Sequence, residues 1–234
     1  MAANIGRPHA FYLPVDLSHT ALLLADIQDE IAARFTSEQL TPYLANVRSL
    51  LGLFRSDIAA RRANIPEGSI NAGIPLIVHQ VFPHGINSNA FMSPYNKMAV
   101  KWKMIELSKG FTAMHTDPNK PHYAVCKELQ PEHWGTPDEI LLGKITAGCF
   151  GGGDLQGYLR ARDIKHVVLC GLTTSGSVLG TARVGADLDL HMIVPRECTM
   201  DDDAEVNEFL LERVLPRQVD VVDLADIKAL FEKA

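Results

Sequence analysis

Three polar side chains, those of Asp26, Lys144 and Ser177, could together cleave an acyl bond. A carboxylate can take a proton from a nucleophile, and a nearby ammonium group can keep that carboxylate charged and oriented. A hydroxyl or thiol in a tight turn can attack a carbonyl carbon while backbone N–H groups of the turn bind the oxyanion. Each residue also has an ordinary role, because Asp and Ser often cap turns or helices and a single Lys is usually solvated.

The residues around Ser177 predict a strand that leads directly into a helix. The segment VVLCGLTTSGSVLGTAR, residues 167–183, begins with an apolar run, passes through a polar turn and continues with small and apolar residues at helical spacing. Ser177 would therefore lie among free backbone N–H groups, at the positive end of the helix dipole. Open α/β sheets place ligand sites at such turns. The same residues would equally suit an ordinary Ser/Thr-rich turn that caps a helix.

Strands alternate with helices along the whole chain. The predicted strands are 20–25, 75–81, 139–142, 167–170, 190–194 and 219–222, and the predicted helices are 37–62, 154–161, the segment from 177, 201–214 and 224–231. This alternation indicates an α/β fold with a doubly wound, mainly parallel sheet and helices on both faces. The carboxyl ends of parallel strands meet at one edge, which would bring Asp26, Lys144 and Ser177 together.

Cap residues mark the starts of two of these helices. Thr36 or Ser37 is expected to cap the long helix at 37–62, and Asp201 or Asp202 is expected to cap the helix at 201–214.

Length and composition favour one soluble domain over residues 1–234, with 1–20 as an N-terminal arm and 83–138 as a long excursion over the carboxyl edge of the sheet. The net charge of −6 argues against nucleic acid as a partner. No apolar run is long enough to cross a membrane, and no signal pattern opens the chain, so we expect a cytoplasmic protein. The four cysteines show no C-x-x-C spacing and are expected to be reduced thiols.

These motifs resemble those of the isochorismatase-like cysteine hydrolases. The resemblance runs from LLLADIQ through LLGKITAGCFGGGDL to VVLCGLTTSGSVLGTAR and DLDLHMIVPRECTMD. It implies the family's three-layer α/β sandwich, with Asp26 as base, Lys144 as the residue that orients it and position 177 as nucleophile. It also implies a cis peptide bond at Leu172–Thr173, and an oxyanion hole made by the backbone N–H groups of Thr173 and Ser177.

The turn TTSG, residues 173–176, looks especially like that of the N-carbamoylsarcosine amidohydrolase and maleamate amidase branches. This implies hydrolysis of a C–N bond in a small amide, ureido or carbamoyl compound, without a cofactor. One residue departs from the pattern, because Ser177 stands where these amidohydrolases have their catalytic Cys, and a hydroxyl is much harder to ionise than a thiol.

Three explanations of Ser177 stay open. It could be an engineered Cys→Ser change that traps a substrate or an acyl state. It could be natural, in a branch that uses Asp26 as a general acid without a covalent step, as isochorismatases proper do. The protein could also be catalytically silent and serve ligand binding or assembly. Cys149 follows Lys144 into the same crevice, but the family does not use that position.

Other residues are candidates for substrate binding or for a metal. Arg196 could bind a substrate carboxylate, unless Glu197 or Asp201 forms an ion pair with it. No metal is expected, because His79 and His84 lack the Asp-x-His pattern of the nicotinamidases in this superfamily, and His79 suits a core position inside a strand. The resemblance implies a homo-oligomer, either a dimer or a tetramer. The full set of substrate-binding candidates is Thr174, Arg196, His84, Phe150 and Trp102. Four further aromatic residues of the excursion could also line a small pocket, although most of these aromatics are expected to pack the excursion onto the sheet: Phe91, Tyr95, Phe111 and Trp134.

Overall fold

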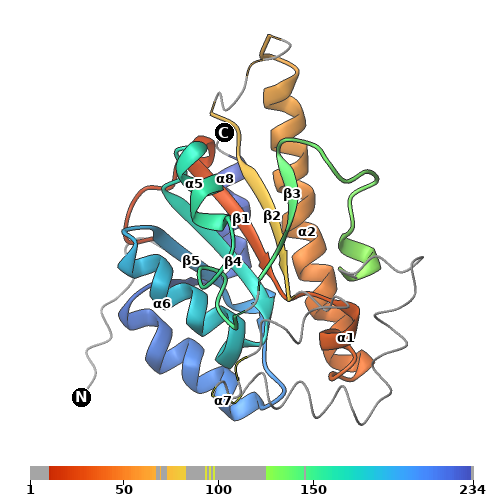
Figure 1. The fold of residues 1–234 in the computed structure, drawn as a ribbon, viewed down its shortest axis with the longest axis vertical. Coiled ribbons are helices and arrows are strands. Elements are labelled where there is room, and N and C mark those ends of the chain that lie inside the picture. The colour runs from red at the N-terminus through yellow and green to blue at the C-terminus, as the bar shows by residue number, and fades with distance from the viewer. Residues whose placement is uncertain are drawn as a thin grey trace.

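The computed structural model describes residues 11–66, 69, 73–82, 93, 95, 97, 125–144 and 146–232. Its centre is a seven-stranded sheet with strand order β3-β2-β1-β4-β5-β7, and β6 pairs with β4 beside this path (Figure 1). The ladders between these strands are parallel, which confirms the predicted doubly wound α/β fold. The strands are β1 (Thr20–Ala25), β2 (Leu76–Val81), β3 (Glu139–Gly143), β4 (His166–Leu172), β5 (His191–Pro195), β6 (Thr199–Met200) and β7 (Asp220–Val222).

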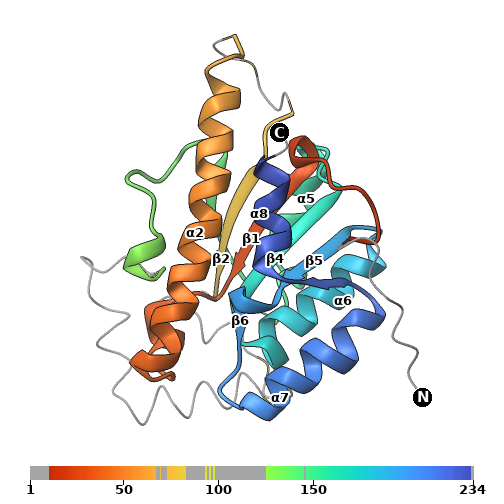
Figure 2. The same ribbon diagram turned by 180° about the vertical axis from the view of Figure 1, so that it is seen from behind.

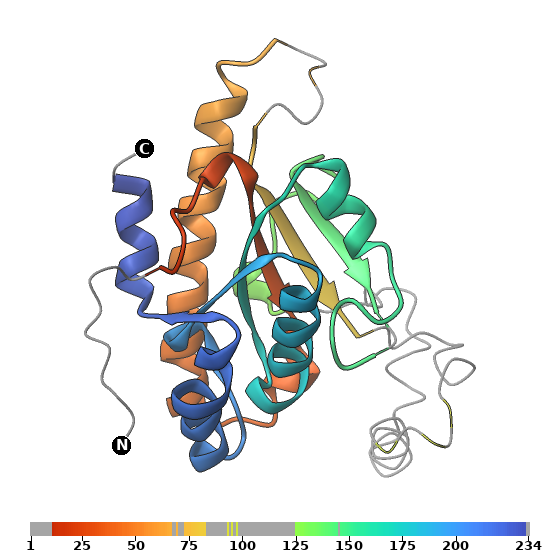
Figure 3. The ribbon, with the colours of Figure 1, turned by 90° about the vertical axis from the view of Figure 1, so that its left-hand side faces the viewer.

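Helices cover both faces of this sheet. One face carries α2 (Ser37–Arg62) and α8 (Leu224–Glu232), which lie side by side (Figure 2). The opposite face carries α5 (Leu155–Ala161) and α6 (Leu179–Asp187), so that the sheet is the middle layer of three (Figure 3). The remaining helical segments are α1 (Asp29–Ala32), α7 (Ala204–Phe209), π-helical turns at Thr174–Val178 and Leu210–Val214, and 3-10 turns at Leu17–His19, Lys127–Leu129, Arg196–Cys198 and Leu215–Arg217.

Strand β1 is buried along its whole length, and its side chains alternate between two cores. Leu22 and Leu24 pack in the core that contains Phe54 of α2. Leu23 packs in the core that contains Leu155 of α5. Burial of one such side chain stabilises a fold by about 1.5–3 kcal/mol. A strand covered on both faces needs an uninterrupted apolar run, which is why the sequence TALLLA predicts it correctly.

Strand β4 continues to Leu172, beyond the predicted end at Cys170. Gly171 and Leu172 pair with the two residues of β6, a strand that the sequence did not predict. Gly171 is required at this point, because a Cβ atom there would lie 2.7 Å from the backbone oxygen of Ala25. The carboxyl ends of β1 and β4 are therefore closely packed.

The two predicted caps had different outcomes. Thr36 caps α2 as expected, with a reciprocal capping box formed with Gln39. The later prediction was wrong, because the cap of α7 is Asp203, whose side chain accepts a hydrogen bond from Val206 N at 3.1 Å, and neither Asp201 nor Asp202 caps it. Strand β6 carries the chain further than expected, so the helix begins at a later residue.

The described residues include the second half of the predicted N-terminal arm, 11–20, and mainly residues 125–138 of the predicted excursion. From the excursion, Val125 forms an antiparallel bridge with Gln28, and the adjacent 3-10 turn at Lys127–Leu129 lies against α2. Residues 1–10, 83–92 and 98–124 lie outside the described ranges.

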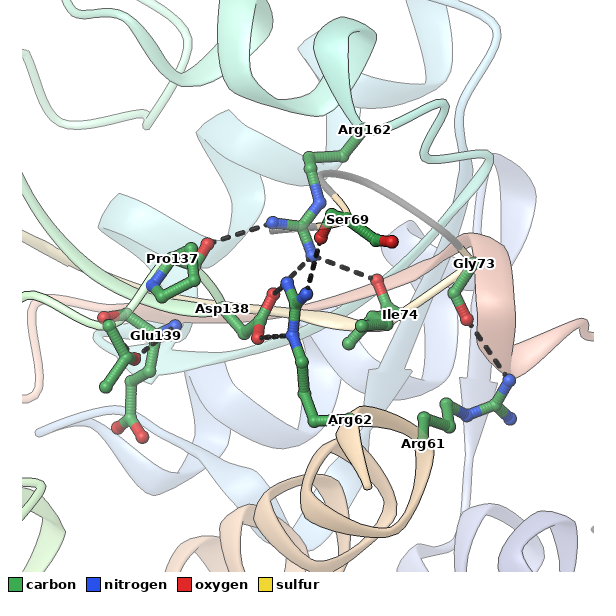
Figure 4. Close-up of polar contacts among 10 residues, drawn as sticks. Arg61, Arg62, Ser69, Gly73, Ile74, Pro137, Asp138, Glu139 and Arg162 are labelled. Carbon is green, nitrogen blue, oxygen red and sulfur yellow. Dashed lines mark hydrogen bonds and ion pairs between the residues drawn. The ribbon is translucent and has the colours of Figure 1, made fainter. Parts of the chain in front are cut away.

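A carboxylate at the amino edge of the sheet joins helices from its two faces (Figure 4). Asp138 accepts hydrogen bonds from Arg62, at the end of α2, at 2.6 and 2.7 Å. It also accepts one from Arg162, which follows α5, at 2.7 Å. Burial raises the pKa of Asp138, but the bonds from the two arginines outweigh this effect and lower it overall.

Replacement of this carboxylate should destabilise the fold strongly. We expect Asp138→Asn to lower the free energy of unfolding by about 3 kcal/mol or more, because Arg162 would stay buried without its counter-charge. The matched control is Asp57→Asn, which removes a helix-surface ion pair with Arg61 and should cost about 0.5 kcal/mol. Urea unfolding of both variants measures the difference, and equal losses would contradict the role given to Asp138.

His79 is a core histidine, as the sequence predicts. Its side chain is 1% exposed, and its Nε2 lies 2.7 Å from Glu139 Oε1. Arg55 donates two further hydrogen bonds to the same carboxylate, and the ring of Trp134 packs edge-on against the imidazole at 5.1 Å. Burial lowers the pKa of His79, and the attraction of Glu139 offsets this only in part.

This depressed pKa predicts a loss of stability in mild acid. The contribution of His79 is fully present above about pH 6.5, the ordinary imidazole pKa, and falls as the pH drops towards the lower folded-state value. We expect His79→Gln to remove part of the decrease in unfolding free energy between about pH 7.5 and about pH 5, by about 1 kcal/mol. His133→Gln is the control, because the His133 side chain is 85% exposed. An unchanged pH profile for His79→Gln would contradict the assignment.

Candidate active site

The parallel sheet brings Asp26 and Lys144 to the same edge. Asp26 directly follows β1 and Lys144 directly follows β3, and both backbones continue the ladder with β2, which lies between them. The backbone N–H of Asp26 donates to Gln80 O at 2.8 Å, and that of Lys144 donates to Val81 O at 2.9 Å. Asp26 adopts a φ of 56°, which turns the chain sharply out of the strand.

A buried ion pair joins these two residues. Lys144 Nζ donates to Asp26 Oδ2 at 2.7 Å and to the backbone oxygens of Thr146 and Ala147 at 2.9 and 2.6 Å. All three protons of the ammonium group therefore have acceptors, which offsets the cost of taking it out of water. The Lys144 side chain is fully buried, and its ammonium group lies 5.8 Å from the centre of the Phe82 ring.

Opposing effects act on the pKa of the Asp26 carboxyl group. Burial raises its pKa, whereas the charge of Lys144, its hydrogen bond and the nearby Ser177 hydroxyl lower it, and the net effect is a raised pKa. Its second oxygen, Oδ1, is buried without a hydrogen-bond partner. A carboxyl group with one fixed and one uncommitted oxygen, and with a pKa moved toward neutrality, is suited to proton transfer.

Ser177 lies in the turn that follows β4, next to this pair. The peptide bond Leu172–Thr173 is cis, as the resemblance implied, and a π-helical turn at Thr174–Val178 precedes α6. The strand therefore leads into a helix as predicted, although the first turn is π-helical. The Ser177 side chain is buried, and its Oγ, like Asp26 Oδ1, has no hydrogen-bond partner. The hydroxyl is close enough to influence the carboxyl pKa, but it is not hydrogen-bonded to it in this geometry.

Two residues that the sequence reasoning missed as site residues hold this turn. Asp201, which follows β6, accepts a hydrogen bond from Ser175 N at 2.7 Å. Asn207 of α7 accepts one from the Thr174 hydroxyl at 2.6 Å. The sequence indicates Asp201 only as a possible helix cap, because β6, which precedes it, is two residues long and gives no strand signal. Asn207 has no signal in the sequence.

Cys149 lies beside the site but is poorly suited to attack. Its backbone is fixed by Thr181 Oγ1 and by the Gln80 side chain, each at 2.9 Å. Burial raises the pKa of its thiol to about 11, although Lys144 lowers it in part. The thiol is therefore protonated near neutral pH. All four cysteines are free thiols, as the sequence predicts.

The structure gives Arg196 partners other than those considered from the sequence. Its guanidinium group forms ion pairs with Glu212 at 2.6 Å and with Asp223 at 2.9 Å, not with Glu197 or Asp201. These two carboxylates occupy the guanidinium nitrogens that a substrate carboxylate would need. Arg196 therefore has a structural role in this conformation.

The remaining substrate-binding candidates are dispersed. Thr174 is fully buried, with its hydroxyl committed to the helix contact described above. Phe150 is partly buried and packs on the core that contains α5. Trp134 packs on His79, and His84 and Trp102 lie outside the described residues.

The described ranges contain neither a candidate metal-binding cluster nor a candidate membrane-spanning helix. No group of three or more His, Cys, Asp or Glu side chains in these ranges could hold a metal ion. Within the same ranges, no helix is both long enough and apolar enough to cross a membrane.

Comparison with known proteins identifies relatives of this chain. The ureidoacrylate amidohydrolase RutB of Stutzerimonas stutzeri is 26% identical over 198 residues, which are 80% of this chain and 72% of that protein. The uncharacterized isochorismatase family protein YecD of Escherichia coli O157:H7 is 30% identical over 108 residues, or 43% of this chain. That match spans 57% of YecD, little more than half of its length.

Solved structures share the fold. A cysteine hydrolase from Pseudomonas syringae pv. phaseolicola superposes with a TM-score of 0.65 and 18% identity, covering 95% of this chain and 97% of that one. N-carbamoylsarcosine amidase from Thermoplasma acidophilum superposes with a TM-score of 0.54 and 19% identity, covering 88% and 96%.

The isochorismatase domain model matches residues 20–226, which begin at β1 and end in α8. This range contains Asp26, Lys144 and Ser177 and every strand of the sheet that brings them to one edge. The chain therefore belongs to the isochorismatase family of hydrolases.

Proposed function

We propose that this protein hydrolyses a C–N bond in a small amide, ureido or carbamoyl compound. The observation that carries the proposal is the buried Asp26–Lys144 pair beside the turn that holds Ser177. The names of two relatives add support, since RutB is a ureidoacrylate amidohydrolase and the Thermoplasma protein is an N-carbamoylsarcosine amidase.

Each residue has a defined role in the proposed reaction. Asp26 takes the proton of the nucleophile at position 177 and gives it to the leaving nitrogen, which leaves an acyl-enzyme. Asp26 then takes a proton from water, which attacks the acyl carbon, releases the acid and restores the nucleophile with that proton. Lys144 keeps the carboxylate oriented and partly offsets the pKa increase caused by burial. The backbone N–H groups of Thr173 and Ser177 receive the oxyanion. With serine in place of cysteine the attack is slow, because a hydroxyl ionises far less readily than a thiol.

A second candidate function is favoured by two details of the site. The pKa of Asp26 is raised by burial, and Ser177 Oγ is not hydrogen-bonded to the Asp26 carboxyl group. A protonated Asp26 could instead act as a general acid on an enol ether or a related substrate, while water attacks and Ser177 only shapes the pocket. No covalent intermediate would then form.

Substitution of Ser177 separates these reactions. We expect Ser177→Cys to increase ammonia release from small amides, ureides and carbamoyl amino acids by roughly two orders of magnitude or more, and Ser177→Ala to abolish it. Ser175→Cys is the matched control, because it places a thiol at an exposed position of the same turn.

The other outcomes are equally informative. Activity that survives Ser177→Ala and does not increase with Ser177→Cys would show that residue 177 is not the nucleophile, and would support the mechanism in which Asp26 is a general acid. Silence of all variants over these substrates would favour a ligand-binding or assembly protein, the third explanation of Ser177.

The pH dependence of turnover tests the role of Lys144. Removal of its charge in Lys144→Met should raise the pKa of Asp26 further, because Lys144 now lowers it. If Asp26 acts as a base, the rising limb of the rate profile moves to higher pH and activity near pH 7 falls. If Asp26 acts as an acid, the falling limb moves to higher pH instead.

Two further variants control this experiment. Asp26→Asn should abolish turnover under either mechanism, and Lys165→Met, which removes an exposed lysine paired with Asp163, should leave the profile unchanged. Circular dichroism checks the folding of Lys144→Met, since an unpaired buried charge can cost about 3–5 kcal/mol. A folded Lys144→Met protein with an unshifted profile would contradict the ion pair's role.

A further inference from the structure

One cavity of the molecule is lined by arginines and by none of the residues of the candidate active site. It has a volume of about 620 Å³ and lies along α6 and the helical segment at 204–217, which run side by side (Figures 1 and 2). Its lining residues are Arg183, Phe209, Arg213, Val214, Arg217 and Gln218. No acidic side chain of the described residues lines it.

The three arginines of this cavity lack the ion pairs that most other arginines form. Within the described ranges, Arg183, Arg213 and Arg217 have no carboxylate within ion-pair distance, and only Arg48 and Arg160 share this property. The arginines that do form ion pairs are Arg34, Arg55, Arg61, Arg62, Arg162 and Arg196. Unpaired guanidinium groups are thus concentrated at one hollow, in a chain whose net charge is −6.

The shape of the cavity adds an apolar contact to this charge. Arg217 is fixed over the preceding turn, because its Nε donates to Arg213 O at 3.0 Å. Phe209 is 59% exposed. Its ring offers a face for a planar or apolar group beside the guanidinium groups. Guanidinium groups bind phosphate and carboxylate oxygens in pairs and stack well on planar groups.

We propose that this cavity binds a small anion with two or more negative charges, carried by phosphate or carboxylate groups, and with a planar or apolar part that covers Phe209. Three like charges around one hollow repel one another, and a multiply charged ligand removes that repulsion. The volume of the cavity falls within the range of small-molecule sites, roughly 300–1,000 Å³. The site does not depend on the proposed hydrolysis.

Calorimetric titration of the full chain tests the charge requirement. Pyrophosphate and citrate distinguish phosphate from carboxylate as the recognised group, and either one binding supports the site. Arg183→Gln and Arg213→Gln should each weaken the tighter of the two by about 10-fold or more, which corresponds to about 1.4 kcal/mol. Arg48→Gln and Arg160→Gln are matched controls, because both replace exposed, unpaired arginines outside the cavity.

Substitution of Phe209 tests whether the ligand has a planar or apolar part. Phe209→Ala should weaken the binding of adenosine diphosphate by several-fold and leave that of pyrophosphate unchanged. Failure of all three anions to bind, or an equal effect of the control arginines, would overturn the proposal. Light scattering completes the experiment: if Arg213→Gln dissociates an oligomer and no anion binds, the cavity is a contact between copies of the chain.

Discussion

The buried ion pair between Asp26 and Lys144 is the contact on which the candidate site depends. A buried pair adds little net stability, because desolvation of both groups cancels most of their attraction. The pair instead requires that the two side chains be positioned accurately. The fold positions them because β1 and β3, which end just before Asp26 and Lys144, lie on either side of β2. Two backbone carbonyls complete the coordination of the ammonium group, so that Lys144 has a single arrangement of partners.

The same pair leaves the chemistry of the site adjustable. Burial and the lysine charge act on the pKa of the Asp26 carboxyl group in opposite directions, and burial is the larger effect. The neighbouring turn is fixed separately, by Asp201 and Asn207, so the residue at position 177 can change without altering the ion pair. A scaffold of this kind can support more than one hydrolytic reaction with few substitutions.

The sequence predicts the parts of the structure that repeat a local pattern. Strand β1 is a continuous apolar run, and α2 shows helical spacing behind a Thr36 cap, so both were predicted with their correct bounds. The placement of Asp26 and Lys144 follows from topology alone. The roles of Asp201 and Asn207 do not, because they depend on β6, which is only two residues long and has no periodic signal. The ion pairs of Arg196 with Glu212 and Asp223 could not be predicted either, because these residues lie far from Arg196 in the sequence and meet it only in the folded chain.

The amino edge of the sheet has a consequence for the way the molecule opens. Asp138 is bonded at once to the end of α2 on one face and to the residue after α5 on the other (Figure 4). Fraying of either helix end removes one of the two positive charges that hold this carboxylate, so the last turns of the two helices are coupled through Asp138. Backbone amides at these two ends should therefore form one unit in hydrogen exchange, although they lie on opposite sides of the sheet.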